Sequence, residues 1–482
     1  HTHIRYSYNC STGVRTHQRS SYRECYWCTY SVMEIMGVQV QRTFVVPPAA
    51  APSEEVPLTV FDLAAPTYHV TVLFAFSPPN PTNQALLDAL SATLPRFPLL
   101  TAAMRLDRRD GARPCFVTGK GDAGALVVEA EVPSSALSDH LPLAPSPGLA
   151  LLHPTVRRGA APHVLMLQIN RFACGGVVIA SLSHHQVADG HSMTMFFHAW
   201  ADAVRGDGLV ADCAPVPYGP AALVPRRPPR CDFEHRGAEF LPLSPAPTHD
   251  DGRASKPPAE VDHHVDTSEI TNMLLHYTSE FVAELKCAAH NRYTTFETVS
   301  AHVWRKITAA RGLADGGDAH TSIRIAVNGR GRLAGTGALP AAGFFGNVVL
   351  TAISGTRAAA LATGTLADAA ALVRAGIRAV DGGYFQSFVD FGALHGDEDL
   401  EPACADEAGV LSLDVEADSW LHLDLHRLDF GCGGRLVGIL PGKVPQDGVV
   451  VLMPSLRKGG GIDVFVALWE KHARELSAIA YT

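Results

Sequence analysis

The sequence predicts an α/β protein built from two domains, and three observations support this prediction. Patterns typical of strands and patterns typical of helices are mixed along the whole chain. The chain has 482 residues, which exceeds the roughly 100–200 residues of a usual domain. A proline-rich stretch at 213–262 has no lasting hydrophobic period, so we interpret it as a crossover linker between a domain at 33–212 and another at 263–482.

The first half carries clear patterns for three strands and a helix. Val70–Phe76 is a continuous apolar run that ends at a cluster of prolines, as a buried strand would. Gln84–Leu94 has leucines at helical spacing on one face, which predicts a helix. His163–Phe172 and Val177–Ser183 are two further strand candidates, and the turn between them contains Cys174 followed by two glycines.

The strand candidate Val177–Ser183 leads through the segment HHQVADG to the start of a helix. Apolar residues from Met193 to Val204 recur at helical spacing, and Gly206 is placed to end the helix. The mixture of elements continues to the end of the chain. We expect helices at Ser279–Asn291, Thr295–Ala310 and Val464–Ile479, and strands at Thr321–Val327, Leu436–Leu440 and Val449–Pro454.

Composition and charge argue against several classes of protein. The net charge of −9 disfavours a nucleic-acid-binding protein, which normally has a basic face. No stretch approaches the ~20 apolar residues that a membrane span needs. The ten cysteines form no disulfide-like framework, and the single Cys-x-x-Cys pair, Cys25 and Cys28, has no second half. We therefore expect a cytoplasmic protein with reduced thiols and with no membrane or nucleic-acid partner.

Residues 1–32 differ from the rest of the chain. They are rich in Tyr, Ser and Arg and contain no apolar segment, so they do not form a secretory signal peptide. We interpret them as a non-native or disordered leader and expect the functional chain to begin near Met33 or Met36.

One histidine stands at a position suited to catalysis. The pattern His-x-x-x-Asp occurs three times, as His185/Asp189, His198/Asp202 and His395/Asp399. His198 lies inside the predicted amphipathic helix, and His395 lies in an acidic, loop-like stretch. Only His185 follows a strand and precedes a helix start, and such junctions are where scaffolds expose reactive side chains.

The chemistry of imidazole makes His185 a candidate general base. Free histidine titrates near pH ~6.5, so its neutral form can accept a proton from an incoming nucleophile at neutral pH. Asp189 has two interpretations at this point: it orients the imidazole as in a catalytic triad, or it forms a structural ion pair that holds the loop. A local, structural role for His185 itself is the alternative.

Other catalytic signatures are missing from the sequence. There is no Gly-x-Ser-x-Gly elbow, no Walker phosphate loop, no Gly-x-Gly-x-x-Gly fingerprint and no His-Glu-x-x-His metal site. Cys174 is an alternative nucleophile, but its turn offers only Arg171 as a basic neighbour that would lower the thiol pKa. These observations favour His185 over the other candidates.

Two motifs and several further blocks resemble a known family. HHQVADG, which contains His185, and LDFGCGG at Leu428–Gly434 resemble the hallmarks His-x-x-x-Asp-Gly and Asp-Phe-Gly-Trp-Gly of the plant BAHD acyltransferases. VPLTVFDL, LSATLPRFPLLTAAM, TTFETVSAHVWR, NGRGRL, GFFGNVV and GIDVFVALWEKH are similar to family blocks and occur in the family order across residues 55–480. Two of them look most like the grass agmatine, putrescine and tryptamine hydroxycinnamoyltransferases.

The resemblance implies a fold and a mechanism. It implies two similar chloramphenicol-acetyltransferase-like domains with a channel at their interface, acyl-CoA as co-substrate, a monomer, and no bound cofactor or metal. His185 would deprotonate the acceptor, which then attacks the thioester carbonyl. Asp189 in this family pairs with an arginine instead of relaying a proton, and Arg330 is the first candidate here, with Arg332 the second.

The second hallmark is architectural in the family. The resemblance assigns Asp429, Phe430, Gly431 and Gly433 to that structural role. This chain departs from the family pattern because Cys432 replaces the usual tryptophan, and Arg435 replaces the usual proline nearby.

A tryptophan upstream of this block has a proposed role in the reaction. Trp420 lies at a spacing similar to that of a family tryptophan whose indole N–H faces the reaction centre, where a donor could stabilise the developing oxyanion. The alternative is that Trp420 is a core aromatic residue.

Acidic residues suggest what the acceptor is. Between Phe385 and Trp420 there are ten acidic residues and no Lys or Arg, which disfavours a carboxylate acceptor and favours a cationic amine. Asp418 matches a position that lines the acceptor pocket in some relatives of the resembled family. The alternative for most of these residues is a solvated acidic loop.

The expected activity is therefore the transfer of a hydroxycinnamoyl or other aromatic acyl group from CoA to an amine such as agmatine, putrescine or a tryptamine-like compound. Three rival functions stay open at this stage. The same fold and base could acylate an alcohol. A peptide-synthetase condensation domain also carries His-His-x-x-x-Asp-Gly, but it needs a carrier-protein partner. Finally, the chain could be a non-catalytic family member.

Overall fold

The computed structural model describes ten segments of a single compact unit, Met36–Thr482. The described residues are 37–47, 52–106, 113–121, 123–155, 163–207, 214–242, 269–315, 318–340, 343–403 and 413–482. The expected leader at 1–32 lies outside them, as do residues 213 and 243–262 of the expected linker. Within the described segments, no helix is both long enough and apolar enough to cross a membrane.

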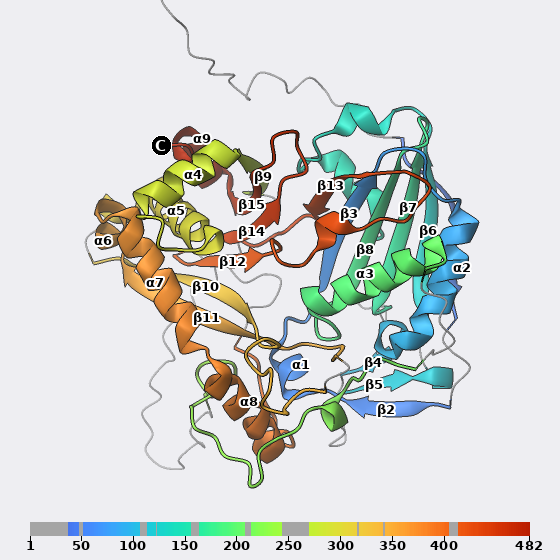
Figure 1. Cartoon of the computed structure of the whole chain (residues 1–482), viewed down its shortest axis with the longest axis horizontal. Helices are drawn as coiled ribbons and strands as arrows, with labels where there is room; N and C mark the ends of the chain where they lie inside the picture. Colours follow the sequence, from blue (N-terminus) through green and yellow to red (C-terminus); the bar gives the residue numbers. More distant parts are fainter. Residues whose placement is uncertain are drawn as a thin grey trace, which may run out of the picture. The chain divides into compact units, whose positions relative to one another are not determined.

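The first of two large sheets has six strands in the order β1-β6-β7-β8-β3-β13 (Figure 1). Neighbouring strands are antiparallel except β6 and β7, which are parallel. The predicted hairpin is formed by β7 and β8. The strands are β1 (Gln39–Val46), β3 (His69–Phe76), β6 (Ala125–Val132), β7 (Leu165–Phe172), β8 (Val177–His184) and β13 (Leu436–Pro441).

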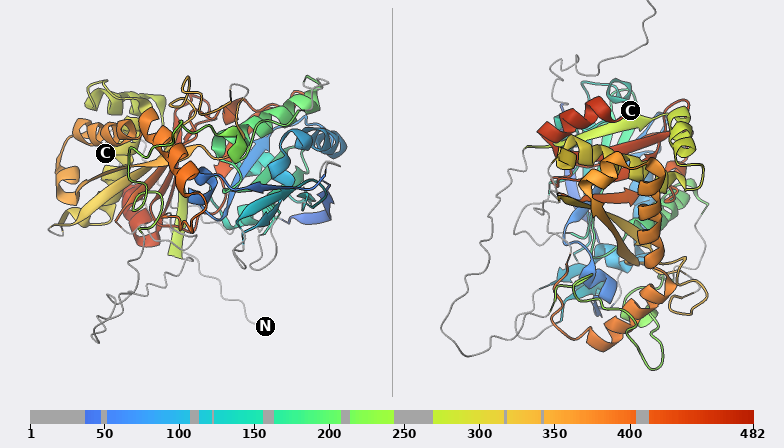
Figure 2. Two further views of the ribbon diagram at one scale, coloured as in Figure 1. Left: turned by 90° about the horizontal axis from the view of Figure 1, so that it is seen from below. Right: turned by 90° about the vertical axis from the view of Figure 1, so that its left-hand side faces the viewer.

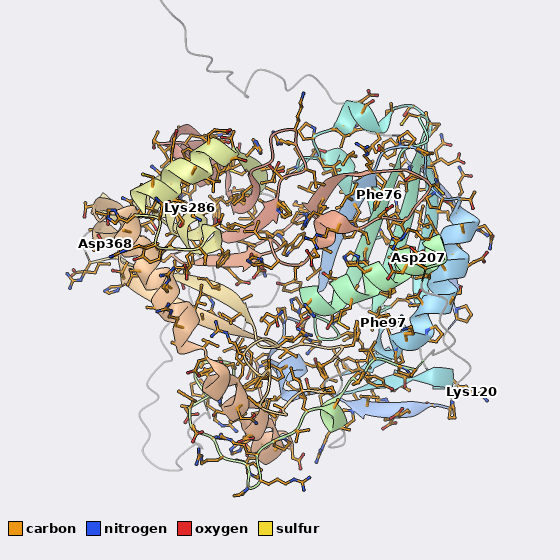
Figure 3. The ribbon with its side chains drawn as sticks, in the orientation of Figure 1. Phe76, Phe97, Lys120, Asp207, Lys286 and Asp368 are labelled. Atoms are coloured by element: carbon orange, nitrogen blue, oxygen red, sulfur yellow. The ribbon has the colours of Figure 1, made fainter. Side chains whose placement is uncertain are left out.

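Two helices, α2 (Asn83–Thr93) and α3 (Gly190–Arg205), pack on each other and on this sheet. Trp200 of α3 is fully buried, and its indole N–H donates to the carbonyl of Leu86 in α2 over 2.8 Å. Aromatic rings fill the space between α3 and the strands, and Phe97, labelled in Figure 3, belongs to this core. Both helices are confirmed where the leucine and phenylalanine spacing predicted them.

The second large sheet has the strand order β11-β10-β12-β14-β15-β9. β10, β12 and β14 run parallel to one another, and the remaining pairs are antiparallel. Because it also has six strands, the α/β architecture with two similar sheets is confirmed. The strands are β9 (Ile270–Tyr277), β10 (His320–Asn328), β11 (Val349–Arg357), β12 (Val415–Ser419), β14 (Val449–Pro454) and β15 (Ile462–Trp469).

Helices gather beside the second sheet, as Figure 2 shows. α5 begins after Thr294, whose side chain and that of Glu297 form a reciprocal capping box, and its bounds match the prediction. The other helices are shorter; four of them lie in the connections between strands, and α9 follows the last strand, β15. The helices of this half are α4 (Ser279–Ala288), α5 (Thr295–Ala310), α6 (Ala358–Thr363), α7 (Leu366–Ala379), α8 (Gly382–His395) and α9 (Glu470–Ile479).

The expected helix at Val464–Ile479 is wrong over its first part. Ile462–Trp469 forms β15, a strand between β14 and β9, and only Glu470–Ile479 is helical. Val464, Val466 and Leu468 are all fully buried, as are the residues between them. A short apolar run that is buried on both faces has no alternation, so its periodicity cannot distinguish a central strand from a buried helix.

One strand of the first sheet comes from late in the sequence. β13 pairs antiparallel with β3, with Leu440 opposite Leu73, although it lies inside the range expected for the second domain. A third, three-stranded sheet has the order β2-β5-β4 and lies next to α1 in Figure 1. Its strands are β2 (Glu54–Pro57), β4 (Ala103–Arg105) and β5 (Cys115–Thr118), and α1 is Val60–Ala64.

The described part of the crossover, 214–242, is fastened to α8. Asp390 is fully buried and accepts hydrogen bonds from the backbone N–H groups of Arg226 and Arg230. The Arg226 side chain also pairs with it. The Asp-Phe-Gly sequence that begins at Asp390 is therefore a structural anchor for the crossover.

Candidate active site

His185 directly follows β8 and is held through its backbone. Its N–H donates to the carbonyl of Tyr68 over 2.9 Å, and its own carbonyl accepts from the side-chain amide of Asn347 over 2.9 Å. Its ring Nδ1 is buried. The β8 strand and the loop before β11 therefore fix where the imidazole lies.

Burial has a direct effect on the ionisation of His185. It lowers the pKa of the imidazole below its usual value of 6.5, while hydrogen bonding to its own backbone, the charge of Asp189 and the Asn347 side chain act in the opposite direction. The net shift is downward, so the ring is neutral at neutral pH. A neutral imidazole is the protonation state that a general base requires.

Asp189 caps the helix that follows. Its carboxylate accepts from the backbone N–H of Ser192 in the first turn of α3 and from the backbone N–H of Val348, each over 2.9 Å. It also forms an ion pair with Arg330 over 2.7 Å. Burial acts to raise the pKa of Asp189, but the arginine charge and the hydrogen bonds outweigh it and hold the pKa below its usual value.

Arg330 and Arg332 occupy different environments. Arg330 donates to Asp189, to the hydroxyl of Ser192 and to the carbonyl of Gly346, and its side chain is 13% exposed. Burial lowers the pKa of Arg332, and the nearest carboxylate acting on it is Asp381. Of the two candidates from the sequence, Arg330 is the one that pairs with Asp189.

Asp62 and Asn347 form a buried pair beside His185 that no sequence motif predicted. Asp62 of α1 accepts a hydrogen bond from the same Asn347 amide group that binds the His185 carbonyl, over 2.9 Å. Its other carboxylate oxygen accepts from the backbone and hydroxyl of Thr59. Burial raises the pKa of Asp62 to about 6, although these hydrogen bonds oppose the shift. Only the proximity created by folding identifies Asp62 and Asn347 as site residues.

Trp420 and Asp418 lie at the end of β12. Trp420 is partly buried against the core, and its backbone N–H donates to Leu452 of β14 over 2.8 Å. Asp418 is half-buried, and burial together with the charge of Glu416 raises its pKa to about 7. Among the described residues, neither side chain forms a hydrogen bond or an ion pair with His185, so the roles of Trp420 and Asp418 stay predictions.

The Asp-Phe-Gly block packs at the far end of α3. Phe430 is buried between Phe76, labelled in Figure 3, and Trp200, with ring centroids 5.4 Å and 4.9 Å away. The Arg205 side chain donates to the carbonyl of Asp429. The Asp429 carboxylate accepts from the N–H of Gly431 over 2.8 Å. This block joins the start of β13 to α3 through packing.

Positive φ angles explain the glycines of this block. Gly431 and Gly433 have φ angles of 83° and 89°, which glycine adopts without a steric cost. Cys432, between them, has φ of 61° and is exposed, so the residue that replaces the family tryptophan does not fill a core position.

The remaining sequence candidates form other contacts. His198 Nε2 lies 3.3 Å from the carbonyl of Asp424, while Asp202 pairs with Arg205. His395 pairs with Glu398 over 2.7 Å. These two His-x-x-x-Asp patterns therefore serve local structure.

A second histidine, His235, belongs to a group that resembles a catalytic triad but has a structural role. His235 lies 3.0 Å from both Ser387 Oγ and Glu239 Oε2, and it is fully buried. Ser387 Oγ accepts hydrogen bonds from the backbone N–H groups of Asp232 and Phe233. Because the hydroxyl is fully buried and already accepts two donors, this group fastens the crossover to α8 and has no access to a substrate.

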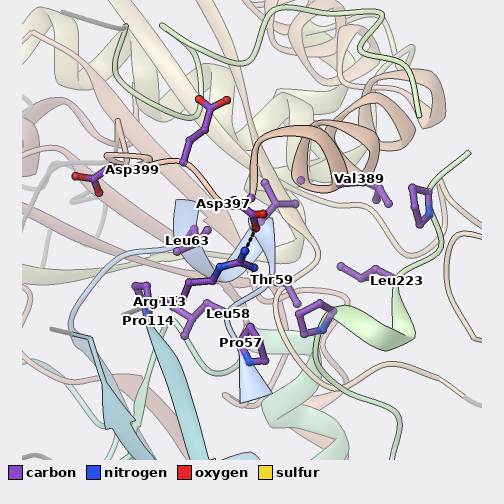
Figure 4. Close-up of a pocket in the computed structure, with 17 residues that line it drawn as sticks. Pro57, Leu58, Thr59, Leu63, Arg113, Pro114, Leu223, Val389, Asp397 and Asp399 are labelled. Atoms are coloured by element: carbon purple, nitrogen blue, oxygen red, sulfur yellow. Dashed lines mark ion pairs between the residues drawn. The ribbon is translucent and has the colours of Figure 1, made fainter. Parts of the chain in front are cut away.

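A cavity of about 500 Å³ lies between α1, the crossover and the end of α8 (Figure 4). Its apolar lining includes Leu63 and Val389, and an ion pair between Arg113 and Asp397 crosses it over 2.5 Å. Thr59 in its wall donates to Asp62, so the cavity borders the hydrogen bonds behind His185. No group of three His, Cys, Asp or Glu side chains suited to a metal ion occurs among the described residues.

Comparisons with known proteins show to which family the chain belongs. The model of the Transferase family matches residues 36–481. Agmatine hydroxycinnamoyltransferase 1 of Oryza sativa subsp. japonica is 38% identical over 439 residues, covering 87% of this chain and 92% of that protein. Tryptamine hydroxycinnamoyltransferase 2 of the same rice is 37% identical, covering 88% and 93%.

The fold is also shared with a solved structure. The crystal structure of vinorine synthase matches with a TM-score of 0.62 at 19% identity, covering 91% of this chain and 96% of that one. At this identity the likeness shows the fold alone. The family match covers almost the whole described chain, and the curated relatives are more than 30% identical. The chain therefore belongs to the BAHD acyltransferase family that its two motifs predicted.

Proposed function

We propose that this acyltransferase moves a hydroxycinnamoyl or other aromatic acyl group from CoA to the nitrogen of an amine such as agmatine, putrescine or a tryptamine-like compound. The observation that carries the chemistry is His185, a neutral imidazole held by its backbone at the junction of β8 and α3. The names of the rice relatives, agmatine and tryptamine hydroxycinnamoyltransferases, support the choice of an amine. The proposed enzyme is a cytoplasmic monomer that uses acyl-CoA as co-substrate, without a bound cofactor, metal or nucleic acid.

The proposed reaction needs one base and leaves no net charge behind. Because Nδ1 of His185 is buried, Nε2 is the ring nitrogen left to meet the acceptor. The amine nitrogen attacks the thioester carbonyl and forms the new C–N bond, while Nε2 takes a proton from that nitrogen. When the C–S bond breaks, the imidazolium returns the proton to the departing thiolate, which leaves as CoA thiol.

The neighbouring residues have supporting roles in this proposal. Asp189 holds the start of α3 through Arg330 and does not relay a proton, because its carboxylate is already occupied by two backbone N–H groups and the arginine. Trp420 is proposed to donate its indole N–H to the oxyanion of the tetrahedral intermediate.

The experiment that tests the function is the release of CoA thiol by the purified protein. p-Coumaroyl-, feruloyl- and benzoyl-CoA would each be combined with agmatine, putrescine, tryptamine, shikimate and a simple alcohol. His185→Ala should lower kcat by at least about 100-fold, the usual range for loss of a general base. His198→Ala, which removes the histidine of a second His-x-x-x-Asp pattern, should leave kcat close to that of the wild type.

The outcomes distinguish the rival functions. Release with amines alone supports N-acyl transfer. Release with alcohols alone would replace it with O-acyl transfer by the same base. No release with any acceptor, or equal activity of His185→Ala and the wild type, would contradict the proposal.

A further inference from the structure

The cavity beside α1 is bounded by contacts that hold its walls in place. Phe61 of α1 packs against Phe388 of α8, with ring centroids 5.0 Å apart. The two helices also approach each other closely at one point, because a Cβ added to Gly392 would lie 2.7 Å from Val60. The crossover is fastened to the same helix by the buried Asp390. The cavity is therefore a preformed feature of the fold, as small-molecule sites usually are.

Most of the cavity wall is apolar. Leu58, Leu63 and Val389 line it, and all three side chains are buried. Prolines from three segments complete the wall, and their fixed φ angles leave it little freedom to collapse. The prolines are Pro57, Pro114, Pro220 and Pro225. The volume of about 500 Å³ falls within the ~300–1,000 Å³ of typical ligand pockets, so the cavity can accommodate an apolar ring.

The polar part of the lining carries more negative than positive charge. Asp397, Glu398 and Asp399 follow the end of α8, and Arg113 is the one Arg or Lys among the described residues that line the cavity. Glu398 pairs with Arg236, which lies outside the lining. The last turn of α8 also lines the cavity, and the C-terminal end of a helix carries a partial negative charge. This distribution of charge favours a cation as the ligand.

The ion pair between Arg113 and Asp397 is easily opened (Figure 4). The two side chains are 59% and 74% exposed, and an exposed pair contributes little because water competes for both charges. A cationic group that reaches Asp397 from within the cavity can therefore replace Arg113 at small cost.

The cavity shares Thr59 with the hydrogen bonds that hold His185. The hydroxyl of Thr59 donates to one carboxylate oxygen of Asp62 over 2.7 Å, and the Asn347 amide joins the other oxygen to the carbonyl of His185. His185 itself does not line the cavity. A ligand packed against Thr59 thus restrains α1, and with it the network on which the position of His185 depends.

We propose that this cavity is a second ligand site, which binds an organic cation with an apolar ring, such as an arylalkylammonium, and whose occupancy raises the rate of acyl transfer through Thr59. The ring lies beside Leu63 and Val389, and the cationic group lies at Asp397 in place of Arg113. Binding is independent of the proposed function, whereas the effect on the rate rests on it. A tryptamine-like acceptor is itself such a cation, so one acceptor molecule can occupy the cavity while another reacts.

Binding is tested by isothermal titration calorimetry of the purified protein with 2-phenylethyltrimethylammonium, which has no N–H group to acylate. We expect a Kd at or below about 1 mM, weaker binding of the neutral 2-phenylethanol, and no binding of phenylacetate. Asp397→Asn should raise the Kd of the cation by about 3-fold or more, whereas Arg113→Gln, which releases Asp397, should lower it by about 3-fold. Glu401→Gln removes an exposed carboxylate outside the cavity and should leave the Kd unchanged.

A matched pair of tryptophan variants tests the location of the site. Leu223 lines the cavity from the crossover, so Leu223→Trp should fill it and raise the Kd by at least about 10-fold. Val224 is exposed and lies outside the lining, so Val224→Trp should leave the Kd unchanged. At a saturating concentration of the cation, kcat with p-coumaroyl-CoA and the fastest acceptor that lacks a ring should rise by at least about 2-fold in the wild type. It should not rise in Leu223→Trp.

Each result bears on the site separately from the function. Opposite shifts of the Kd in the two charge variants, with loss of binding in Leu223→Trp, support the site. Absence of saturable binding, shifts of the same sign, or a cation that raises the acceptor KM without changing kcat would overturn it. Binding without a change in kcat would overturn the coupling to His185. If the wild type acylates no acceptor, the proposed function fails and the coupling fails with it, while the calorimetry still decides whether the cavity binds the cation.

Discussion

Asn347 connects three parts of the chain that are far apart in sequence. Its side-chain amide donates one hydrogen bond to Asp62 of α1 and one to the carbonyl of His185, both over 2.9 Å. Its backbone neighbour Val348 donates to Asp189. The position of the proposed base thus depends on a residue that carries no charge, and a buried network of this kind is strong only when every member is satisfied.

Asp62 gives this network a measurable dependence on pH. Its pKa is about 6 in the folded protein, above the value of ~3.9 expected in the unfolded chain. The folded state therefore binds more protons between these values, so the contribution of Asp62 to stability is complete below pH ~4 and is lost as the pH rises through ~6.

Asp62→Asn removes the titrating carboxyl group and tests this dependence of stability on pH. The free energy of unfolding of the wild type, relative to that of the variant, should fall by up to about 3 kcal/mol between pH 4 and pH 7. The reason is that the pKa of Asp62 differs by about 2 between the folded and unfolded chain, and each pKa unit corresponds to about 1.4 kcal/mol. Urea unfolding at four pH values would measure the difference. A difference that is independent of pH would show that the Asp62 carboxyl titrates alike in the folded and unfolded chain.

At the scale of elements, α3 depends on how its first turn is held. Asp189 accepts from the first turn, and Arg330 reaches it from beyond the end of β10. Both side chains are largely buried, so loss of either partner leaves a charge without compensation, which costs about 3–5 kcal/mol. The ion pair therefore ties the start of α3 to the second sheet.

The ion pair between Asp189 and Arg330 predicts a non-additive loss of stability. Arg330→Ala and Asp189→Ala should each lower the free energy of unfolding by about 3–5 kcal/mol, and the double variant should lose less than the sum because the two side chains share one interaction. Arg332→Ala, which removes a nearby arginine that does not pair with Asp189, should cost less. Urea unfolding of the wild type and the four variants measures these losses, and strictly additive losses would contradict a direct pair.

Local patterns predicted those elements whose burial differs between faces or whose ends carry a cap. α3 has a polar cap and an apolar face, and α5 has the Thr294 and Glu297 capping box, so both were found within a few residues. β15 was mistaken for a helix because it is buried on both faces. β12 was not predicted at all, because its half-buried face carries Glu416 and Asp418, and acidic residues are depleted in strands.

The candidate site was predictable only where chemistry is concentrated in one short motif. His185, Asp189 and the pairing with Arg330 followed from the His-x-x-x-Asp-Gly motif and the family resemblance. Asp62 and Asn347 did not, since each is ordinary in its local context and gains meaning from a contact across 285 residues of sequence. Long-range hydrogen bonds leave no periodic signal in a single sequence.

At the scale of the whole chain, the first sheet includes a strand from the second half of the sequence. β13 follows the Asp-Phe-Gly block late in the sequence and completes the first sheet beside β3. Ring contacts repeat this pattern, because Phe97 from the first half packs on Phe345 from the second at 5.1 Å. The loop that carries His185 is in turn held by residues that follow β10 and precede β11. The candidate site around His185 is therefore built from both halves.

Because the first sheet needs β13, we predict that the first half does not fold stably by itself. A fragment of residues 37–242 lacks β13 and leaves the hydrogen-bonding edge of β3 open, together with the buried face of Phe76 and its neighbours. Open strand edges favour association between chains, so we expect the fragment to aggregate or to elute as large oligomers in size-exclusion chromatography. Joining residues 428–443 to its C-terminus through a flexible Gly/Ser linker restores the pairing with β3, and a larger monomer fraction is expected. If the fragment without β13 is monomeric and unfolds as cooperatively as the extended fragment, the edge strand is dispensable, and the two halves are more independent than their shared sheet implies.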